Sequence, residues 1–376
     1  MSSWRYHNPV EIIYGAGKSI VLPDLIRHAN VVLITTCGFR KRGYVSVLEK
    51  MLKSSLKYVY DDVQSHPTFV SIKEAYKAVK SVEYDIILAL GGGSAIDTAK
   101  GLSAITAAGS NGWFEDHLKS NAPFPDTFLP KPIIAIPTTA GTGSEVTMWA
   151  TVWDMEEKRK YSISHLLLYP QKALLDPELT LTLPESETIF SGLDAFSHAI
   201  ESIWNKNHNL ISDTFASKAI SLIYHTLPVL KNNLSDLNLR NSMLHASLLA
   251  GLAFSNTMTT LAHAISYSLT AQHGLPHGLA CALPLPHLFN INGIHAKNRV
   301  KLISSALDAG ENIDMAYTKI IQFFESLDVS LKLKDYGIGN DCADNIIHSV
   351  LTSKRTKNNI VDLSDAELKN LVKGLF

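Results

Sequence analysis

The sequence predicts an α/β domain built on a parallel sheet, followed by an all-helical domain. Up to about residue 180, short apolar runs rich in β-branched residues alternate with helical segments, as in a parallel sheet covered by helices. Two of these runs end directly in loops rich in glycine, serine and threonine. After Asp176-Pro177 and Leu183-Pro184, strand-like runs become rare and helical periodicities dominate. We therefore place the domains at residues 1–181 and 182–376.

In the first domain, runs such as VVLIT are typical of strands that a parallel sheet buries on both faces. Segments with apolar residues at helical spacing separate these runs. The strands are predicted over 9–14, 31–35, 58–60, 85–90 and 132–136, and the helices over 44–56 and 70–81.

Two loops follow predicted strands directly. Strand 85–90 runs into GGGSAIDTAK (91–100), whose glycines let the backbone approach an anion and whose helix start offers free N–H groups. This motif is neither GxGxxG nor a Walker A loop, so a flexible turn remains the alternative. Strand 132–136 runs into PTTAGTGSE (137–145), at the strand end where open α/β sheets bind ligands. Two such loops together favour a nucleotide cleft.

In the second domain, helical periodicity extends over 187–204, 211–231, 237–254, 256–273, 296–309 and 313–327. Asp194 and His198 are four residues apart, which places both on one helix face. His263, His273 and His277 follow further along the chain. One carboxylate and several imidazoles suit Fe(II) or Zn(II) better than Mg²⁺ or Ca²⁺. Because the chain has 15 histidines, hydrogen-bonded core histidines are the alternative.

Composition narrows the class of protein. The chain of 376 residues is long for a single core, and its formal net charge of −1 offers no basic excess for nucleic acid. Three widely spaced cysteines without a CxxC motif favour a reducing compartment over a disulfide framework. The start lacks the build of a signal peptide, and no apolar run reaches the roughly 18 residues of a membrane span. We therefore expect a cytoplasmic protein that binds neither nucleic acid nor membrane.

The order of the motifs GGGSAIDTAK, PTTAGTGSE, GLDAFSHAIE and the later PHG resembles that of the iron-dependent (group III) alcohol dehydrogenases, over nearly the whole chain. The resemblance implies a dehydroquinate-synthase-like architecture, with an N-terminal Rossmann-like dinucleotide domain and a C-terminal helical metal-binding domain around a shared cleft. It also implies a homodimer. The implied reaction is hydride transfer between the nicotinamide C4 and a small aldehyde or alcohol, whose oxygen the metal ion polarises.

The family's site positions fall on matching residues of this chain. The implied metal ligands are Asp194, His198, His263 and His277. The implied cofactor-binding residues are Gly92, Gly93, Ser94, Asp97, Thr138, Thr139, Thr142, Lys160 and Leu179. His273 lies outside the ligand pattern and is expected to line the pocket. Many relatives have a second histidine four residues after the third ligand, where this chain has Tyr267. A tyrosine is a poorer proton shuttle at neutral pH, so the proton relay is in doubt, and a packed aromatic is the alternative.

The cofactor is expected to be NADPH, with NADH as a second option. Where NAD-preferring relatives tend to have an aspartate after the second strand, this chain has Thr36, followed by a basic run at Arg40-Lys41-Arg42. A small neutral residue beside cations tolerates a 2′-phosphate.

The substrate is the least specified feature. The HAISYSLTAQHGLPHGLA segment and the LTSKRTKNNI stretch resemble the subgroup that reduces phosphonoacetaldehyde to 2-hydroxyethylphosphonate. A phosphonate needs cationic and polar donors. The candidates are Lys354, Arg355, Lys357, Asn358 and Asn359, unless this stretch is merely a solvated loop. Sulfoacetaldehyde, lactaldehyde and simple short-chain alcohols remain alternatives. So does a different class, a non-redox lyase like dehydroquinate synthase; a non-catalytic nucleotide-binding protein would not need the ligand set.

Overall fold

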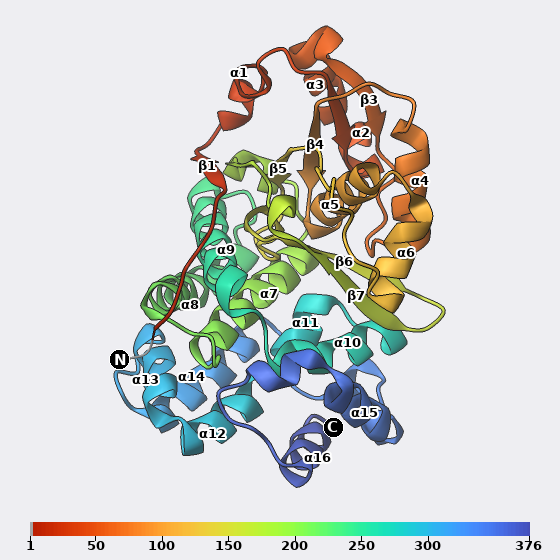
Figure 1. The fold of residues 1–376 in the computed structure, drawn as a ribbon. Helices are drawn as coiled ribbons and strands as arrows, with labels where there is room; N and C mark the ends of the chain where they lie inside the picture. The colour runs from red at the N-terminus through yellow and green to blue at the C-terminus, as the bar shows by residue number, and fades with distance from the viewer. Residues whose placement is uncertain (1–2) are drawn as a thin grey trace. The chain divides into compact units, whose positions relative to one another are not determined.

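The structure, a computed structural model, describes residues 3–376, which form two compact units. We call residues 8–139 and 144–180 the sheet unit, and residues 3–7, 140–143 and 181–376 the helical unit. Figure 1 shows the strands in the first and only helices in the second. The predicted fold class, α/β followed by all-α, is therefore confirmed.

The sheet unit is built on a six-stranded parallel sheet in the order β1-β8-β5-β4-β2-β3. Its strands are β1 (Glu11–Tyr14), β2 (Val31–Ile34), β3 (Leu56–Tyr60), β4 (Ile86–Gly91), β5 (Ile133–Pro137) and β8 (Lys172–Leu175). Its helices are α1 (Leu22–Ile26), α2 (Cys37–Lys41), α3 (Tyr44–Leu52), α4 (Phe69–Val79), α5 (Gly93–Ala108) and α6 (Asn111–Ser120). Each predicted strand overlaps an observed one, and the helix predicted over 44–56 ends earlier, at Leu52.

Both faces of this sheet are covered, which explains the uninterrupted apolar runs. Along β2, Val31 and Leu33 pack in the core that α1 and α3 complete. Val32 and Ile34 point to the opposite face, where α4 and α5 contribute. Because successive strand residues face opposite sides, every residue of β2 must be apolar.

The sequence did not predict strands beyond 136. Strand β6 (Trp149–Asp154) pairs with β7 (Arg159–Ser164) in an antiparallel hairpin, and β8 returns to the parallel sheet. Strand β7 reads RKYSIS, and only its Ile163 is buried, so its sequence carries little of the apolar signal that marks a strand.

The helical unit consists of ten α-helices with short connections. They are α7 (Glu185–Ile203), α8 (Leu210–Lys231), α9 (Leu237–Thr257), α10 (Leu261–His273), α11 (His277–Ala282), α12 (Leu285–His295), α13 (Lys297–Ala306), α14 (Ile313–Ser326), α15 (Ala343–Thr352) and α16 (Asp365–Gly374). A 3₁₀ helix, η8 (Lys354–Asn358), joins the last two. Between residues 3 and 376 no single helix is long and apolar enough to cross a membrane, although the bent pair α9 and α10 passes that test when taken together.

The helix predicted over 256–273 is wrong at its start. Residues 256–257 end α9, and α10 begins only at Leu261. Met258 has a φ of 66°, in the left-handed region, which breaks the helix and lets α10 leave at a new angle.

A buried lysine connects the two glycine-rich motifs within the sheet unit. Lys100 on α5 is fully buried, and its Nζ donates to the carbonyl and hydroxyl oxygens of Ser144, to Thr147 Oγ1 and to the Trp149 carbonyl, at 2.7–3.1 Å. Burial lowers the pKa of Lys100 to about 8 and raises the pKa of the neighbouring Glu145 to about 7. This lysine therefore fixes the end of the second motif against the helix of the first.

We predict that Lys100→Met destabilises the sheet unit by roughly 3 kcal/mol, because it leaves buried acceptors without a donor and Glu145 without its cation. Denaturant unfolding followed by circular dichroism measures this loss. Lys77→Met, at an exposed position on α4, is the matched control and should change stability by less than about 0.5 kcal/mol. Equal stability of the two variants would contradict the assignment.

Candidate metal centre and cofactor loops

The predicted ligands on α7 lie on one buried face of that helix. Asp194 and His198 are both at least nine-tenths buried, and His198 Nε2 is 3.8 Å from Asp194 Oδ1. The His198 ring lies flat against Phe254 of α9, with centroids 3.9 Å apart and planes at 4°. The spacing of four residues therefore places both side chains on one face of α7, as the sequence predicts.

Helices α10 and α11 bring the other donors to α7 (Figure 1). His263 of α10 has its Nε2 3.6 Å from Asp194 Oδ1. Helix α11 crosses α7 so closely that a Cβ at Gly278 would lie 1.9 Å from the Phe190 carbonyl oxygen and 3.0 Å from Asp194 Cβ. Only glycine fits there, and this close approach places His277, the first residue of α11, beside Asp194.

Donor atoms of four residues lie within 4.8 Å of one another: Asp194, His263, His277 and Cys281. His198 is the neighbour of this group, with its ring centroid 4.6 Å from that of His263. The structure therefore brings three of the four predicted ligands into one group, places His198 directly beside it, and adds a thiol that the sequence did not predict.

This cluster fits a divalent ion. Asp194 Oδ1 and His263 Nε2 are buried and have no hydrogen-bond partner, although buried polar atoms are nearly always satisfied. Burial alone would raise the pKa of Asp194, but His198, His263 and His277 lower it below its usual range, so the carboxylate is ionised. An anionic oxygen and imidazole nitrogens that converge without partners are the donor set of an Fe(II) or Zn(II) site.

Glu201 orients His263 from behind. Its fully buried carboxylate accepts a hydrogen bond from His263 Nδ1 at 2.6 Å, from the Thr260 N–H at 3.0 Å and from the Ala262 N–H at 2.7 Å. Because the Glu201 carboxylate accepts from Nδ1, the neutral form of His263 presents the lone pair of Nε2 to the centre of the cluster. A carboxylate–histidine pair of this kind fixes the tautomer of a metal-binding imidazole.

The two remaining predicted pocket residues also lie on α10. The ring of Tyr267 is half-buried and stacks parallel to that of His277, with centroids 6.4 Å apart. His273 is the last residue of α10, before Gly274, and is half-buried outside the donor group. Their roles in the reaction stay predictions.

The predicted cofactor residues of the sheet unit gather at the carboxyl ends of its strands. Thr36 follows β2, Gly92, Gly93 and Ser94 follow β4, Thr138 and Thr139 follow β5, and Leu179 follows β8. Gly91 has a φ of 153°, and a Cβ there would lie 2.7 Å from Ala95 Cβ, so the turn into α5 requires glycine. This edge is where parallel sheets bind nucleotides.

Other predicted cofactor residues have structural partners. Asp97 accepts hydrogen bonds from Ser144 Oγ at 2.6 Å and from the Thr151 N–H at 2.8 Å. Lys160 lies on β7, with its Nζ 5.8 Å from the centroid of the Trp153 ring. Thr142 belongs to the helical unit, because Gly141 and Gly143 beside it approach α7 and α9 too closely to carry a side chain.

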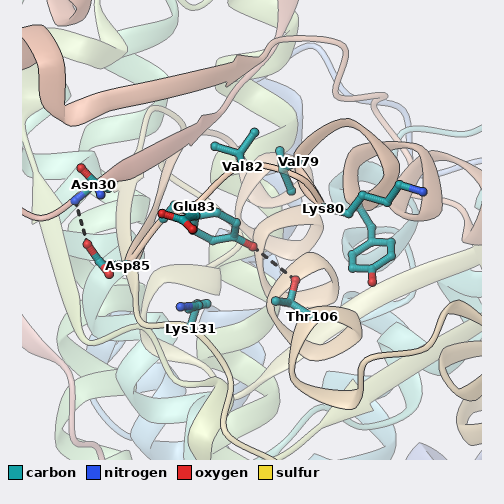
Figure 2. Close-up of a pocket in the computed structure, with 10 residues that line it drawn as sticks. Asn30, Val79, Lys80, Val82, Glu83, Asp85, Thr106 and Lys131 are labelled. Atoms are coloured by element: carbon teal, nitrogen blue, oxygen red, sulfur yellow. Dashed lines mark hydrogen bonds between the residues drawn. The ribbon is translucent and has the colours of Figure 1, made fainter.

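A surface pocket of about 510 Å³ in the sheet unit lies elsewhere (Figure 2). It is lined by Asn30, Asp85 and Lys131, which precede β2, β4 and β5 and therefore mark the amino ends of the strands. Its polar groups bond to each other: the Asn30 N–H donates to Asp85 at 2.9 Å, and the Tyr84 hydroxyl meets Thr106 Oγ1 at 3.2 Å. The pocket is therefore a poor candidate for the nucleotide site.

Comparison with known proteins decides the family. Residues 9–177 match the family described as iron-containing alcohol dehydrogenase, and residues 188–376 match its C-terminal domain family. The chain belongs to the iron-containing alcohol dehydrogenases. It is an NAD(P)-dependent enzyme of this type, which favours the dehydrogenase reading over the lyase.

Three similar proteins illustrate the family. NAD-dependent methanol dehydrogenase of Bacillus methanolicus is 32% identical over 299 residues, which are 80% of this chain and 74% of that protein. Sulfoacetaldehyde reductase of Bilophila wadsworthia is 29% identical over 370 residues, 93% of this chain and 92% of that protein. The crystal structure of sulfoacetaldehyde reductase from Bifidobacterium kashiwanohense in complex with NAD+ has a TM-score of 0.93 at 29% identity, covering 100% and 99% of the two chains.

Sequence reasoning missed two residues at the candidate metal centre of this dehydrogenase. Glu201 follows Asp194 by seven positions and His198 by three, so helical spacing alone places it on the same face. Cys281 follows His277 by four positions within α11. The same rule that paired Asp194 with His198 therefore identifies both.

We predict that Glu201→Gln lowers the affinity of the dehydrogenase for its divalent ion by roughly 10- to 100-fold. The amide NH₂ would donate to His263 Nδ1 and force the proton onto Nε2, the atom that must bind the ion. Competition with a chelator measures the affinity. Glu187→Gln, an exposed carboxylate on the same helix, is the control. An unchanged affinity in Glu201→Gln would refute the orienting role.

Proposed function

We propose that this dehydrogenase reduces a small anionic aldehyde to its alcohol, with NADPH as the preferred hydride donor. Phosphonoacetaldehyde, reduced to 2-hydroxyethylphosphonate, is the first candidate. Sulfoacetaldehyde shares its chemistry, and two similar proteins act on that compound. Neutral short-chain aldehydes such as lactaldehyde are the second candidate class.

The observation that carries the anionic substrate is the position of η8. This segment contains Lys354, Arg355 and Lys357 and packs against α10, the helix of His263 and Tyr267. None of these three cations forms a salt bridge with a carboxylate among residues 3–376. Arg355 is half-buried, so its guanidinium is available to an anion at lower solvent screening than the two exposed lysines.

Side-chain amides hold η8 in this place. Asn359 is fully buried and exchanges side-chain hydrogen bonds with Asn292 of α12 at 3.1 and 3.5 Å. Asn358 Nδ2 donates to the Thr259 carbonyl at 2.9 Å, just before α10 begins. Hydrogen bonds therefore tie this segment to α12 and to the residue before α10, so it is not a solvated loop.

The chain's residues divide the work of the proposed reaction. Asp194, His198, His263 and His277 would hold the divalent ion, which supplies a Lewis acid that polarises the aldehyde carbonyl. Arg355 binds the anionic end of the substrate. NADPH, when bound, would supply the hydride for the carbonyl carbon, and one proton would complete the alcohol on oxygen. The proton comes from solvent or from a nearby side chain, with Tyr267 and His273 as candidates.

We predict that kcat/KM with NADPH is roughly tenfold or more higher for phosphonoacetaldehyde or sulfoacetaldehyde than for lactaldehyde or propionaldehyde. Nicotinamide absorbance measures the rates for the metal-loaded enzyme. A higher rate on one of the two anions decides between phosphonate and sulfonate. Comparable rates on the neutral aldehydes would leave a general short-chain aldehyde reductase.

Arg355→Ala should lower kcat/KM roughly 10- to 100-fold for the anionic aldehydes and leave propionaldehyde unchanged, because it removes one charge-assisted hydrogen bond. Lys373→Ala, at an exposed cation on α16, is the matched control. An equal loss on charged and neutral aldehydes would assign Arg355 to folding and not to recognition.

The NADPH preference is proposed from the surroundings of Thr36 in the sheet unit. Arg42 of the basic run lies near Thr36, because a Cβ at Gly38 would be 3.6 Å from Thr36 Oγ1 and 3.1 Å from Arg42 Nη1. Arg40 is paired with Asp61 and Glu49, whereas Arg42 forms no salt bridge among residues 3–376. Arg42 and Lys41 therefore remain for a 2′-phosphate, and Arg42, whose guanidinium lies 4.5 Å from the centroid of the Phe39 ring, is the one near Thr36.

Arg42→Ala should reduce the ratio of kcat/KM for NADPH over NADH by roughly 10- to 100-fold, because a charge-assisted hydrogen bond is lost for NADPH only. Steady-state kinetics with each cofactor measures the ratio. Lys50→Ala, exposed on α3, serves as control. A ratio that stays constant in Arg42→Ala would remove the basis for NADPH and favour NADH, the form named for two relatives.

A further inference from the structure

Three polar atoms in the second half of α10 are buried without a partner. They are Ser268 Oγ, Thr270 Oγ1 and His273 Nε2, and none of them forms a hydrogen bond with any residue that the structure describes. Buried hydroxyls of α7, such as those of Ser197 and Ser202, donate to the carbonyl four positions earlier. The Thr270 hydroxyl makes no such bond to its own helix. Because buried polar atoms are nearly always satisfied, it requires a partner from outside the chain, such as ordered water.

Helical spacing places Thr270 on a line that starts at the candidate metal centre. His263, Tyr267 and Thr270 occupy positions i, i+4 and i+7 of α10, which form one face of a helix. His273 comes three positions after Thr270 and is therefore its neighbour on the helix surface. With a rise of about 1.5 Å per residue, the line from His263 to His273 is about 15 Å long. Ser268, five positions after His263, lies on the opposite face.

The ring of His273 connects this buried line with solvent. His273 is half-buried, and its Nε2 is buried. Its Nδ1 is not among the buried atoms without a partner, and no described residue forms a hydrogen bond with it, so Nδ1 meets solvent. A neutral imidazole can accept a proton on one nitrogen and release a proton from the other. Solvent can therefore protonate Nδ1 while Nε2 passes its proton inward, and exchange with water restores the starting tautomer.

We propose that His273 and Thr270, joined by ordered water, carry a proton from solvent along α10 to Tyr267 and the oxygen of the substrate. The proposal rests on the aldehyde reduction put forward above and names the source of its proton. Aldehyde, NADPH and one proton give alcohol and NADP+. NADPH supplies the hydride, and the proton that reaches the oxygen is replaced from solvent at His273. The Tyr267 hydroxyl accepts one proton as it donates another, so it need not ionise.

Small buffers should repair the loss of either relay group. In a bulky buffer, His273→Ala should lower kcat by roughly 10- to 100-fold, and added imidazole should restore most of the rate. Thr270→Val keeps the shape of the side chain and should cause a similar loss, whereas Thr270→Ser keeps the hydroxyl and should stay near the wild-type rate. Ser268→Ala is the matched control, because it removes an equally partnerless, buried hydroxyl from the opposite face.

The solvent isotope effect separates a relay from a packing role. The ratio of kcat in H₂O to kcat in D₂O should rise in His273→Ala and Thr270→Val, while the KM for NADPH and the affinity for the divalent ion stay unchanged. Thr270→Val removes a hydroxyl that bonds to no described residue, so its unfolding midpoint should stay the same or rise. Wild-type rates in both variants overturn the relay. A lost rate that imidazole does not repair, with an unchanged isotope effect, overturns it as well.

The relay and the substrate are judged separately, because the assay uses whichever aldehyde the wild type reduces fastest. A preference for neutral aldehydes, with relay variants that behave as expected, overturns the anionic substrate and supports the relay. Unchanged kinetics of the variants on a preferred anionic aldehyde overturn the relay while the proposed function stands. A wild-type protein that reduces no aldehyde would overturn both.

Discussion

The crossing of α11 over α7 at Gly278 is the contact on which the candidate metal centre depends. A Cβ at this position would lie 1.9 Å from the Phe190 carbonyl oxygen, so a side chain would push the two helices apart. His277 and Cys281 both ride on α11, and Asp194 lies on the stretch of α7 beneath it. Donors from two helices thus meet because one residue has no side chain, and packing, not local spacing, sets their distances.

The Glu201 carboxylate both caps the start of α10 and orients the ring of His263. A buried charge costs several kcal/mol unless hydrogen bonds satisfy it, and here backbone N–H groups of Thr260 and Ala262 do so at the start of α10. Those are groups that a helix N-terminus leaves without partners, and the helix dipole favours a negative charge there. The same carboxylate holds the proton of His263 on Nδ1. Helix start, ring orientation and tautomer are therefore coupled through one side chain.

Hydrophobic periodicity and residue spacing predicted the parallel strands and one pair of candidate ligands. The apolar runs identified the parallel strands, and the i,i+4 rule placed Asp194 with His198 on one helix face. Periodicity could not predict the polar strand β7, or the break at Met258 that separates α9 from α10, since its positive φ leaves no mark on hydrophobic spacing. Cys281 was missed although it follows His277 by four positions, because a lone cysteine in an apolar segment is normally a small packed residue, and only the structure shows its neighbours.

Helix α10 is held at two places by different parts of the chain. The candidate metal donors and the candidate substrate-binding cations therefore come from different segments. Glu201 fixes its beginning, and the segment η8, tied down through Asn358 and Asn359, packs along it. The donors to the ion come from α7, α10 and α11, whereas the cations come from η8 alone. If η8 binds the substrate as proposed, a change in its charge would alter which aldehyde is bound without moving a predicted metal ligand. Under that proposal substrate preference would depend on one short segment, which likeness over the whole fold does not determine.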